Sequence, residues 1–290
     1  MPSANDSCSP VTRISKANME PLLAADTSQN SALVRQATVG ILIRFANSAA
    51  TLPDVLAALK AQTLQPDAIL GVDSGSSDGS DRLIRNAGGQ VIFWSHRYEH
   101  SKVLNFGLKQ LPTDLVLVLS SHTVLEDPET LSRMVKCMSD PRTACVSLKW
   151  DDDPFYSDAI DWGELSAEGL KFGSIYSNSM GMLRRSLWER QPFDESLDTA
   201  EDYAWAIHQV HLGNVCRRLA LPFRYRRSGH NRDGEFARIV FGLARQHRLK
   251  VTWLGLRATL TAWLKAVFQR DSDAALHRSR LIACCRALLA

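Results

Sequence analysis

A run of glycine, serine and aspartate residues, VDSGSSDGS at 72–80, is the first segment of this sequence that is able to do chemistry. It follows a short apolar stretch, so Asp73 would present a carboxylate beside the exposed backbone N–H groups of a loop. Such a carboxylate accepts hydrogen bonds from a base or a ribose. The alternative is a strand-to-helix turn whose Ser and Asp side chains only cap the next helix. The loop lacks the G-x-G-x-x-G dinucleotide pattern, and a Walker loop is also absent.

A second acidic feature is the pair Glu201–Asp202, which opens the segment EDYAWAIHQVHLGN. The pattern predicts a helix over Thr199–Leu212, with Gly213 as its stop signal. Both carboxylates then lie in the first turn, where the helix dipole favours their ionised form. An ionised carboxylate can act as a general base. Acidic residues at helix N-termini are equally common for capping alone, so both interpretations stay open.

The elements that must position these residues alternate along the first half of the chain. Short apolar runs predict buried strands, and apolar stripes at helical spacing predict helices. The strands are expected at 38–44, 67–73, 90–94 and 114–120, and the helices at 48–62, 81–87 and 102–111. This alternation implies right-handed βαβ units and a mostly parallel α/β sheet. Ligands bind such sheets at the carboxyl ends of the strands, which here are Arg44–Asn47, Asp73–Ser80 and Ser120–Asp127.

The second half of the chain is less regular until it becomes helical from Phe236. Helix is expected at Asp161–Phe172 and a strand at Asn214–Leu219. Residues 236–290 contain ten Lys and Arg against two Asp, a net charge of +8 in a chain whose total is +3. Apolar residues recur there at helical spacing from Trp253 to Val267. This basic extension either docks on an anionic membrane surface or packs on the α/β domain or on a second subunit, as in a homodimer.

Bulk composition restricts the class of protein. The 290 residues are 45% hydrophobic and 22% charged, which is ordinary for a globular protein. The six cysteines show no zinc-ligand spacing, which favours small buried side chains in a reducing compartment. The polar N-terminus, about 1–37, is expected to be a flexible arm, with a short helix near Met19–Leu23. No stretch has the ~18 consecutive apolar residues of a membrane span, so we expect a cytoplasmic protein, with peripheral attachment at the inner face of the membrane open. No nucleic-acid-binding motif is found.

Five segments, in order, resemble the family 2 glycosyltransferases, whose fold is called GT-A. VDSGSSDGS is similar to the signature that follows the family's second strand, and HSKVLNFG at 100–107 to a segment near the bound nucleotide sugar. LVLVLSSHTVLEDP at 115–128 occupies the place of the strand and its Asp-X-Asp motif. SNSMGMLRRSLWERQPFDE at 177–195 and AEDYAWAIHQVHLGN at 200–214 resemble the acceptor-side stretch and the Glu-Asp motif. Together they cover about residues 38–215.

The resemblance implies roles for individual residues. Asp202 would be the general base of an inverting transfer, with Glu201 orienting it or the acceptor. The donor would be a UDP- or dTDP-sugar, and the acceptor a glycan or a lipid-linked molecule in surface polysaccharide assembly. The expected donor-binding residues are Arg44, Asn47, Asp73, Ser74, Ser76, Lys102, Asn105, Ser120, Ser121 and Arg184.

One motif departs from the family pattern, because Ser120-Ser121-His122 stands where most members have Asp-X-Asp. That motif supplies oxygen ligands to a divalent cation, and serine hydroxyls are poor substitutes. A Ser-X-His variant occurs in one branch of the family, so His122, and more loosely His230, are expected ligands of a Mn²⁺ or Mg²⁺ ion. The alternative is that His122 only caps its loop. Arg224, Arg226 and Arg227 could then neutralise the leaving diphosphate in place of the metal.

These observations predict a GT-A domain at 38–235 and a helical extension at 236–290. The expected enzyme is a hexosyl- or deoxyhexosyltransferase. A non-catalytic homologue that binds a sugar nucleotide or glycan is one alternative, because the Asp-X-Asp motif is lost. A nucleotidyltransferase on a similar sheet is the other, although the Gly-rich loop of such enzymes is missing at RFANS, residues 44–48. The donor sugar and base, the acceptor, the metal requirement and the oligomeric state are not determined by the sequence.

Overall fold

The computed structural model describes residues 37–150, 157–170, 175–197, 199–226 and 233–250, with a few isolated positions beyond (260, 264, 267, 268, 278, 281, 282 and 285). The chain divides into two units, Met1–Gln36 and Ala37–Ala290, and every described residue lies in the second. The expected arm and its short helix at Met19–Leu23 therefore lie outside the described residues, as does His230.

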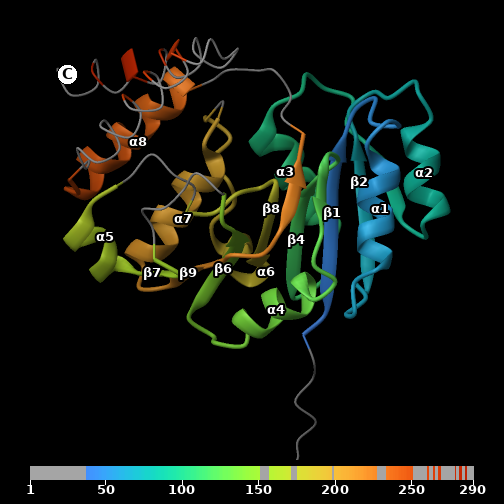
Figure 1. Ribbon diagram of the computed structural model, residues 1–290, viewed down its shortest axis with the longest axis horizontal. Coiled ribbons are helices and arrows are strands. Elements are labelled where there is room, and N and C mark those ends of the chain that lie inside the picture. The colour runs from blue at the N-terminus through green and yellow to red at the C-terminus, as the bar shows by residue number, and fades with distance from the viewer. Residues whose placement is uncertain are drawn as a thin grey trace, which may run out of the picture. The chain divides into compact units, whose positions relative to one another are not determined.

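The first half of the second unit alternates strands and helices as expected (Figure 1). In chain order the elements are β1 (Val39–Phe45), α1 (Leu52–Lys60), β2 (Ala68–Asp73), α2 (Ser80–Asn86), β3 (Gln90–Phe93), α3 (His100–Lys109) and β4 (Leu115–Ser120). Strands β1 to β4 pair in parallel. All six residues of β4 are buried, which explains why LVLVLS is apolar without alternation.

The second half contributes smaller elements, several of which the sequence pattern did not reveal. They are β5 (Thr123–Leu125), α4 (Thr130–Cys137), β6 (Thr143–Leu148), β7 (Ala159–Ile160), α5 (Trp162–Glu168), β8 (Met180–Arg184), α6 (Arg185–Arg190), α7 (Glu201–His211), β9 (Val215–Leu219), β10 (Phe223–Tyr225) and α8 (Asp233–His247). The helix expected at 161–172 is present as the shorter α5. The helix expected at 199–212 and the strand expected at 214–219 are present as α7 and β9, each slightly shorter than expected.

The main sheet has eight strands in the order β3-β2-β1-β4-β8-β6-β9-β7, and β5 pairs with β10 in a separate ribbon. Strand β8 runs antiparallel to both of its neighbours, so the sheet is mixed but mostly parallel. Because β8 is antiparallel, it begins at the edge where β4 ends, with Met180 opposite Leu119. This reversal brings the turn that precedes β8 to the carboxyl end of β4.

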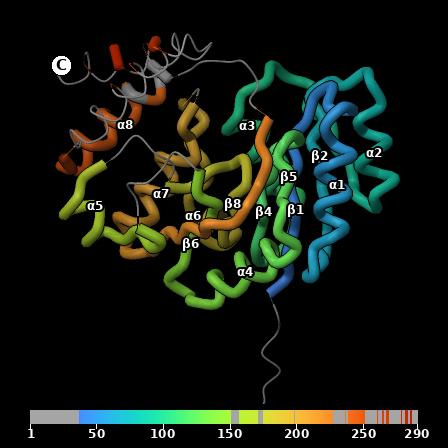
Figure 2. Tube along the Cα trace, viewed as in Figure 1, coloured from blue at the N-terminus to red at the C-terminus, as the bar shows by residue number. Residues whose placement is uncertain are grey.

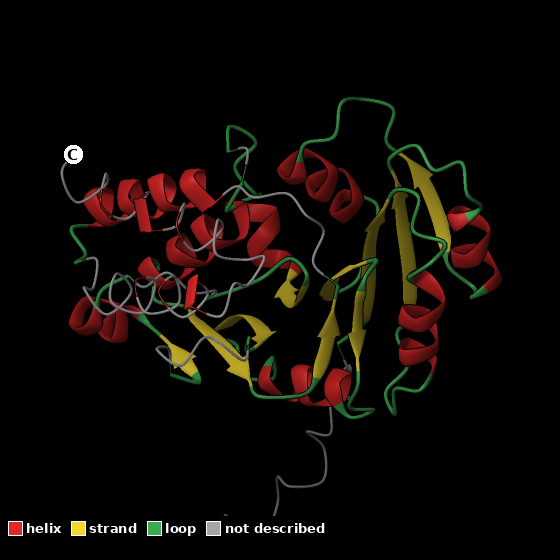
Figure 3. Cartoon of the chain, turned by 45° about the horizontal axis from the view of Figure 1, so that its top comes forward, coloured by secondary structure: helices red, strands yellow, loops and turns green. Residues whose placement is uncertain are grey.

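Helices cover both faces of the sheet, as Figures 2 and 3 show. Buried side chains of α3, α7 and α8 form one core with one face, and those of α1, α2 and α4 form the second core with the other. Gly107 lets α3 approach the sheet closely, since a Cβ there would lie 2.6 Å from a methyl carbon of Leu42. Helix α8 crosses the expected domain boundary at 235/236 and packs on α7, with the rings of Phe236 and Tyr203 5.5 Å apart.

Beyond residue 250 only isolated residues are described, and Leu260, Leu264, Val267 and Phe268 are exposed. Within the described part of the chain, no helix combines the length and the hydropathy needed to cross a membrane. The described cysteines are free thiols. Cys145 and Cys216 are buried in neighbouring strands, as expected for small apolar side chains, whereas Cys285 is exposed.

Candidate active site

The carboxyl ends of β1, β2 and β4 meet at one edge of the sheet. In the strand register Arg44 lies opposite both Val72 and Ser120, and Phe45 lies opposite Asp73. The three loops expected to bind a ligand therefore leave the sheet side by side. Their convergence follows from parallel pairing, which aligns strand ends that are distant along the chain.

Hydrogen bonds connect the loops that follow these strands. The Asn47 N–H donates to Ser76 Oγ over 3.0 Å, and the Ser77 N–H donates to Asn47 Oδ1 over 2.9 Å. Asn47 has a φ of 48°, in the left-handed region that Asn tolerates better than most residues. The hydroxyls of Ser48 and Ser121 lie 2.9 Å apart. Asn47, Ser76 and Ser121 thus hold the loops together at the position the sequence predicted for donor binding.

Asp73 shapes the loop that it opens. Its Oδ1 accepts the backbone N–H groups of Gly75 (3.0 Å) and Ser76 (2.8 Å), and the carboxylate is buried. The neighbouring Ser74 hydroxyl is buried and has no hydrogen-bond partner among the described residues. Asp78, and not Asp73, accepts the N–H of Ser80, the first residue of α2. The loop is therefore organised around Asp73 itself.

Asn178, in the turn before β8, connects the three charged residues of the site. Its backbone N–H donates to Asp202 Oδ2 (3.0 Å), its side-chain amide donates to Glu201 Oε1 (3.2 Å), and its carbonyl accepts a hydrogen bond from Arg44 Nη1 (2.9 Å). Asn178 is buried. The sequence analysis did not single it out, because its position beside β4 depends on the antiparallel strand β8. The only signal was its place in the segment 177–195 that resembles the acceptor-side stretch of the family.

The two carboxylates of α7 differ in their surroundings. Glu201 is buried, whereas Asp202 keeps some solvent exposure although protein surrounds it closely. Burial and the adjacent Glu201 raise the pKa of Asp202 from 3.8 to about 7, against hydrogen bonds from Asn178 and Tyr203 and the charge of Arg44. A carboxyl group with this pKa can exchange a proton near neutral pH.

Arg44 lies opposite Ser120 at the end of β4 and interacts with both carboxylates of the pair. Burial acts to lower the pKa of Arg44, but its interactions with Tyr98, Glu201, Tyr225 and Asp202 raise it overall, so the guanidinium stays charged. The charge of Arg44 also affects His122: burial, and then Arg44, lower the pKa of His122. At neutral pH His122 is therefore an uncharged imidazole next to a cation.

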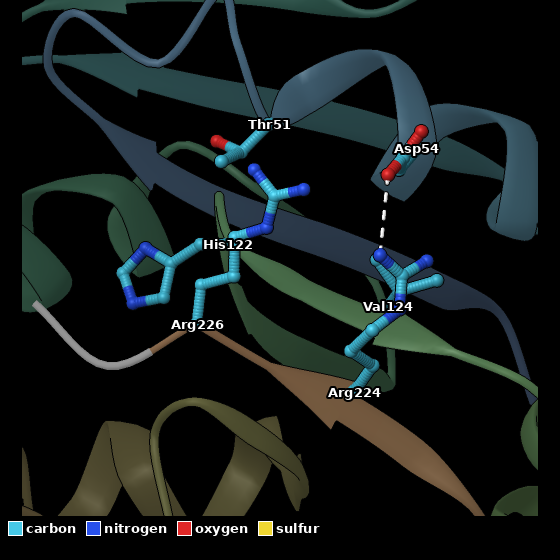
Figure 4. Close-up of a pocket in the computed structure, with 6 residues that line it drawn as sticks. All are labelled: Thr51, Asp54, His122, Val124, Arg224 and Arg226. Atoms are coloured by element: carbon cyan, nitrogen blue, oxygen red, sulfur yellow. Dashed lines mark hydrogen bonds and ion pairs between the residues drawn. The ribbon is translucent and has the colours of Figure 1, made fainter.

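His122 lines a pocket together with Thr51, Asp54, Val124, Arg224 and Arg226 (Figure 4). Its ring lies 4.9 Å from that of Tyr225, and Ser120 Oγ lies within hydrogen-bonding distance of the ring nitrogens. The backbone N–H of Arg226 donates to the carbonyl of His122 over 3.2 Å. The ribbon of β5 and β10 thus places two arginines beside the end of β4.

The residues present around His122 do not fit a divalent cation well. Such a cation prefers several anionic oxygen ligands. Here the Ser120 hydroxyl contacts His122, the Ser121 hydroxyl contacts Ser48, the positive charge of Arg44 acts on the His122 ring, and the one carboxylate that lines the pocket, Asp54, pairs with Arg224. Among the described residues, no three His, Cys, Asp or Glu side chains come together as a metal site would require.

Lys102 and Asn105, on α3, were expected near the nucleotide sugar. Lys102 Nζ lies 2.5 Å from Glu99 Oε2 at the start of the helix. Asn105 is buried and holds the Phe-Asp-Glu stretch, since its amide donates to the Phe193 carbonyl and to Glu195 Oε1, both over 2.9 Å. Its Oδ1 accepts the Trp188 indole N–H over 3.0 Å. Asn105 therefore anchors the acceptor-side segment, and contact with a donor remains a prediction.

Arg184 is a correction to the expected donor site. It lies opposite Leu115, where β4 begins, and so at the sheet edge opposite to Asp73 and Ser120. Its guanidinium donates to three carbonyl oxygens, those of Thr143, Met138 and Asp140. A five-residue strand separates it from the turn that holds Asn178. The charge of Arg184 is used to join β8 to β6, and a ligand at the carboxyl edge is out of its reach.

Comparisons with known proteins agree with this architecture. The chain is 28% identical over 193 residues to an O-antigen chain rhamnosyltransferase of Salmonella typhimurium, an alignment that covers 60% of this chain and 62% of that protein. It therefore spans less than two thirds of the length of that relative.

Two solved structures show the same fold. A mannosyltransferase from Pyrobaculum calidifontis, in complex with GDP-Man and Mn²⁺, has a TM-score of 0.58 at 17% identity, covering 88% of this chain and 75% of that one. Glucosyl-3-phosphoglycerate synthase from Mycobacterium tuberculosis has a TM-score of 0.56 at 15% identity, covering 72% and 79%. The predicted α/β fold of the GT-A type is confirmed.

The family comparison covers the strand ends of the site and stops before the carboxylate pair at 201–202. A model described as glycosyl transferase family 2 matches residues 41–190, which include β1, the Asp73 loop, the end of β4 and the Asn178 turn. This match extends over more than half of the chain. The chain belongs to glycosyl transferase family 2.

Proposed function

We propose that the chain transfers a sugar from a nucleotide-diphosphate donor to a hydroxyl group of a glycan or lipid-linked acceptor, with inversion at the anomeric carbon. The observation that carries this proposal is the Asp202 carboxylate, whose pKa is about 7 and which adjoins Arg44 at the edge where the loops of β1, β2 and β4 converge. A base of this pKa is half ionised near neutral pH, which suits proton transfer.

In the proposed reaction, Asp202 removes the proton of the acceptor hydroxyl while its oxygen attacks the anomeric carbon. The bond between that carbon and the diphosphate oxygen breaks, and the nucleoside diphosphate leaves with the electron pair. Asn178 fixes one carboxylate oxygen of Asp202 through its backbone N–H and holds Glu201 through its side chain. The loop around Asp73 binds the nucleoside part of the donor.

The substrate class follows from the relative. A rhamnosyltransferase that builds an O-antigen chain supports a deoxyhexose donor and a polysaccharide acceptor for this chain. We propose a dTDP- or UDP-linked deoxyhexose, assembled into a surface glycan. Lys102, Ser74 and Ser120 remain proposed donor contacts, because each lies on an element that reaches the carboxyl edge.

The test is a transfer assay with UDP-, dTDP- and GDP-sugars and a lipid-linked oligosaccharide acceptor, in which nucleoside diphosphate release and the anomeric configuration of the product are measured. Asp202→Asn should lower kcat by about 10²–10⁴-fold, the usual contribution of a general base, with donor affinity unchanged. Asp81→Asn is the matched control, because Asp81 also lies in the first turn of a helix but is far from the carboxylate pair in sequence and pairs with Arg85.

Two results would contradict the proposal. Near-normal turnover of Asp202→Asn would remove Asp202 from the mechanism. Binding of a sugar nucleotide without transfer to any acceptor would favour the non-catalytic homologue, the alternative that the lost Asp-X-Asp motif supports.

A further inference from the structure

The pocket beside His122 holds one arginine whose charge the described residues do not neutralise. Arg224 is engaged, since its Nη1 lies 3.4 Å from Asp54 Oδ2 and its Nε lies 3.4 Å from Glu126 Oε1. Arg226, two residues later, has no carboxylate within ion-pairing distance in the described ranges. Figure 4 shows its guanidinium directed toward Thr51, in the same pocket as His122.

This cation belongs to the candidate active site by position. The Arg226 backbone N–H is bonded to the His122 carbonyl, and Tyr225 pairs with Thr123 in the β5–β10 ribbon. His122 follows the end of β4, where Arg44 lies opposite Ser120, and the charge of Arg44 acts on the His122 ring. Arg44 and Arg226 therefore both lie close to His122. The Asp202 and Glu201 carboxylates are held through Asn178 instead.

A site of this composition attracts phosphate and repels metal ions. Two guanidinium groups raise the local potential, and each can bind phosphate oxygens through two parallel hydrogen bonds. The His122 imidazole adds a ring nitrogen that can donate a hydrogen bond and carries no negative charge. In most family members the carboxylates of Asp-X-Asp would lie at this strand end, whereas here Ser120 and His122 leave it without acidic groups.

We infer that Arg226, together with Arg44 and His122, binds the diphosphate of the nucleotide donor directly, so that donor binding needs no divalent cation. The inference rests on the proposed function and specifies how its leaving group is held. In this arrangement the arginines stabilise the negative charge that develops on the diphosphate when its bond to the sugar breaks.

Calorimetry on the full chain tests this without an activity assay. UDP, dTDP, GDP and inorganic pyrophosphate are titrated in EDTA and, separately, in MnCl₂. We expect at least one nucleoside diphosphate to bind with similar affinity in both conditions. Arg226→Gln should weaken its binding by about tenfold or more, because a charge-assisted hydrogen bond is lost, and should leave the affinity for the matching nucleoside unchanged.

Arg217→Gln is the matched control. It removes the same charge from β9, where Asp140 already pairs with it over 3.3 Å and which does not line this pocket, so nucleotide affinity should stay close to that of the parent chain. A double variant, Ser120→Asp with His122→Asp, restores carboxylates at the strand end. We expect its nucleotide binding to become dependent on Mn²⁺.

The outcomes separate the inference from the function on which it rests. Binding that disappears in EDTA and returns with Mn²⁺ would overturn the inference and leave the proposed transfer intact. Unchanged affinity in Arg226→Gln would also overturn it. If no nucleoside diphosphate binds in either condition, the proposed donor site fails as well.

Discussion

At the scale of single residues, the site depends on one asparagine and the charges that it joins. Asn178 donates to both Asp202 and Glu201 and accepts from Arg44, so a single buried side chain with its backbone sets the spacing of three ionisable groups. Burial, and then the charge of the adjacent Glu201, raise the pKa of Asp202 to about 7. Their different environments assign the base to Asp202, the more accessible of the two.

This arrangement predicts the pH dependence of turnover. Asp202 acts as a base only when deprotonated, so kcat should rise with pH through about 7 and level off above. Asn178→Asp adds a negative charge beside the pair, which should raise the pKa of Asp202 further and move the acidic limb of the profile to higher pH. Rate profiles at saturating donor measure both. A limb that stays in place in Asn178→Asp would contradict the assigned network.

At the scale of elements, strand β8 decides which residues meet. Because it is antiparallel, its N-terminal turn lies at the carboxyl end of β4, where the Ser120 N–H donates to the Ser179 carbonyl over 3.0 Å. Its other end carries Arg184 to the opposite edge. One strand thus contributes Asn178 to the site and removes Arg184 from it, although the two residues are close in sequence.

Arg184 is accordingly predicted to stabilise the fold and not to bind the donor. Arg184→Ala removes hydrogen bonds to three carbonyl oxygens that tie β8 to the start of β6. We expect the free energy of unfolding to fall by about 1–3 kcal/mol, with KM for the donor unchanged. Urea denaturation and donor kinetics measure the two quantities. An increase in donor KM without loss of stability would return Arg184 to the binding site.

At the scale of the whole molecule, two cores enclose a mostly parallel sheet whose carboxyl edge carries the acidic pair. Keeping Asp202 in this environment has a cost in stability. Its pKa is about 7 in the folded chain and near 3.8 when unfolded. Between these values the folded state holds a proton that the unfolded state has lost, so the free energy of unfolding decreases as pH rises through this window.

Asp202→Asn removes that titration and should therefore stabilise the chain at pH 8 relative to the parent, with a smaller gain at pH 5. Urea denaturation at the two pH values gives the two differences in unfolding free energy. If the difference in unfolding free energy between Asp202→Asn and the parent chain does not grow with pH, the pKa of Asp202 is not raised in the folded state. Such a result would also weaken its assignment as the base.

The sequence by itself determined the alternation of the first four strands with three helices, and with it the edge where the loops at Arg44, Asp73 and Ser120 meet. It did so because fully buried parallel strands read as continuous apolar runs and because their ends align. It also placed Glu201 and Asp202 in the first turn of a helix, through their position before a helical pattern and a glycine stop.

Only the tertiary structure decided which of the remaining residues belong to the site. Short strands such as β6, β8 and β10 carry weak patterns, and the direction of β8 is set by packing between β4 and β6. That direction brings Asn178 in and takes Arg184 out. In the β5–β10 ribbon, Arg224 pairs with Asp54 and Glu126, whereas the Arg226 guanidinium has no ion-pair partner among the described residues. Pairing direction and charge neutralisation depend on contacts between distant segments, which no local pattern records.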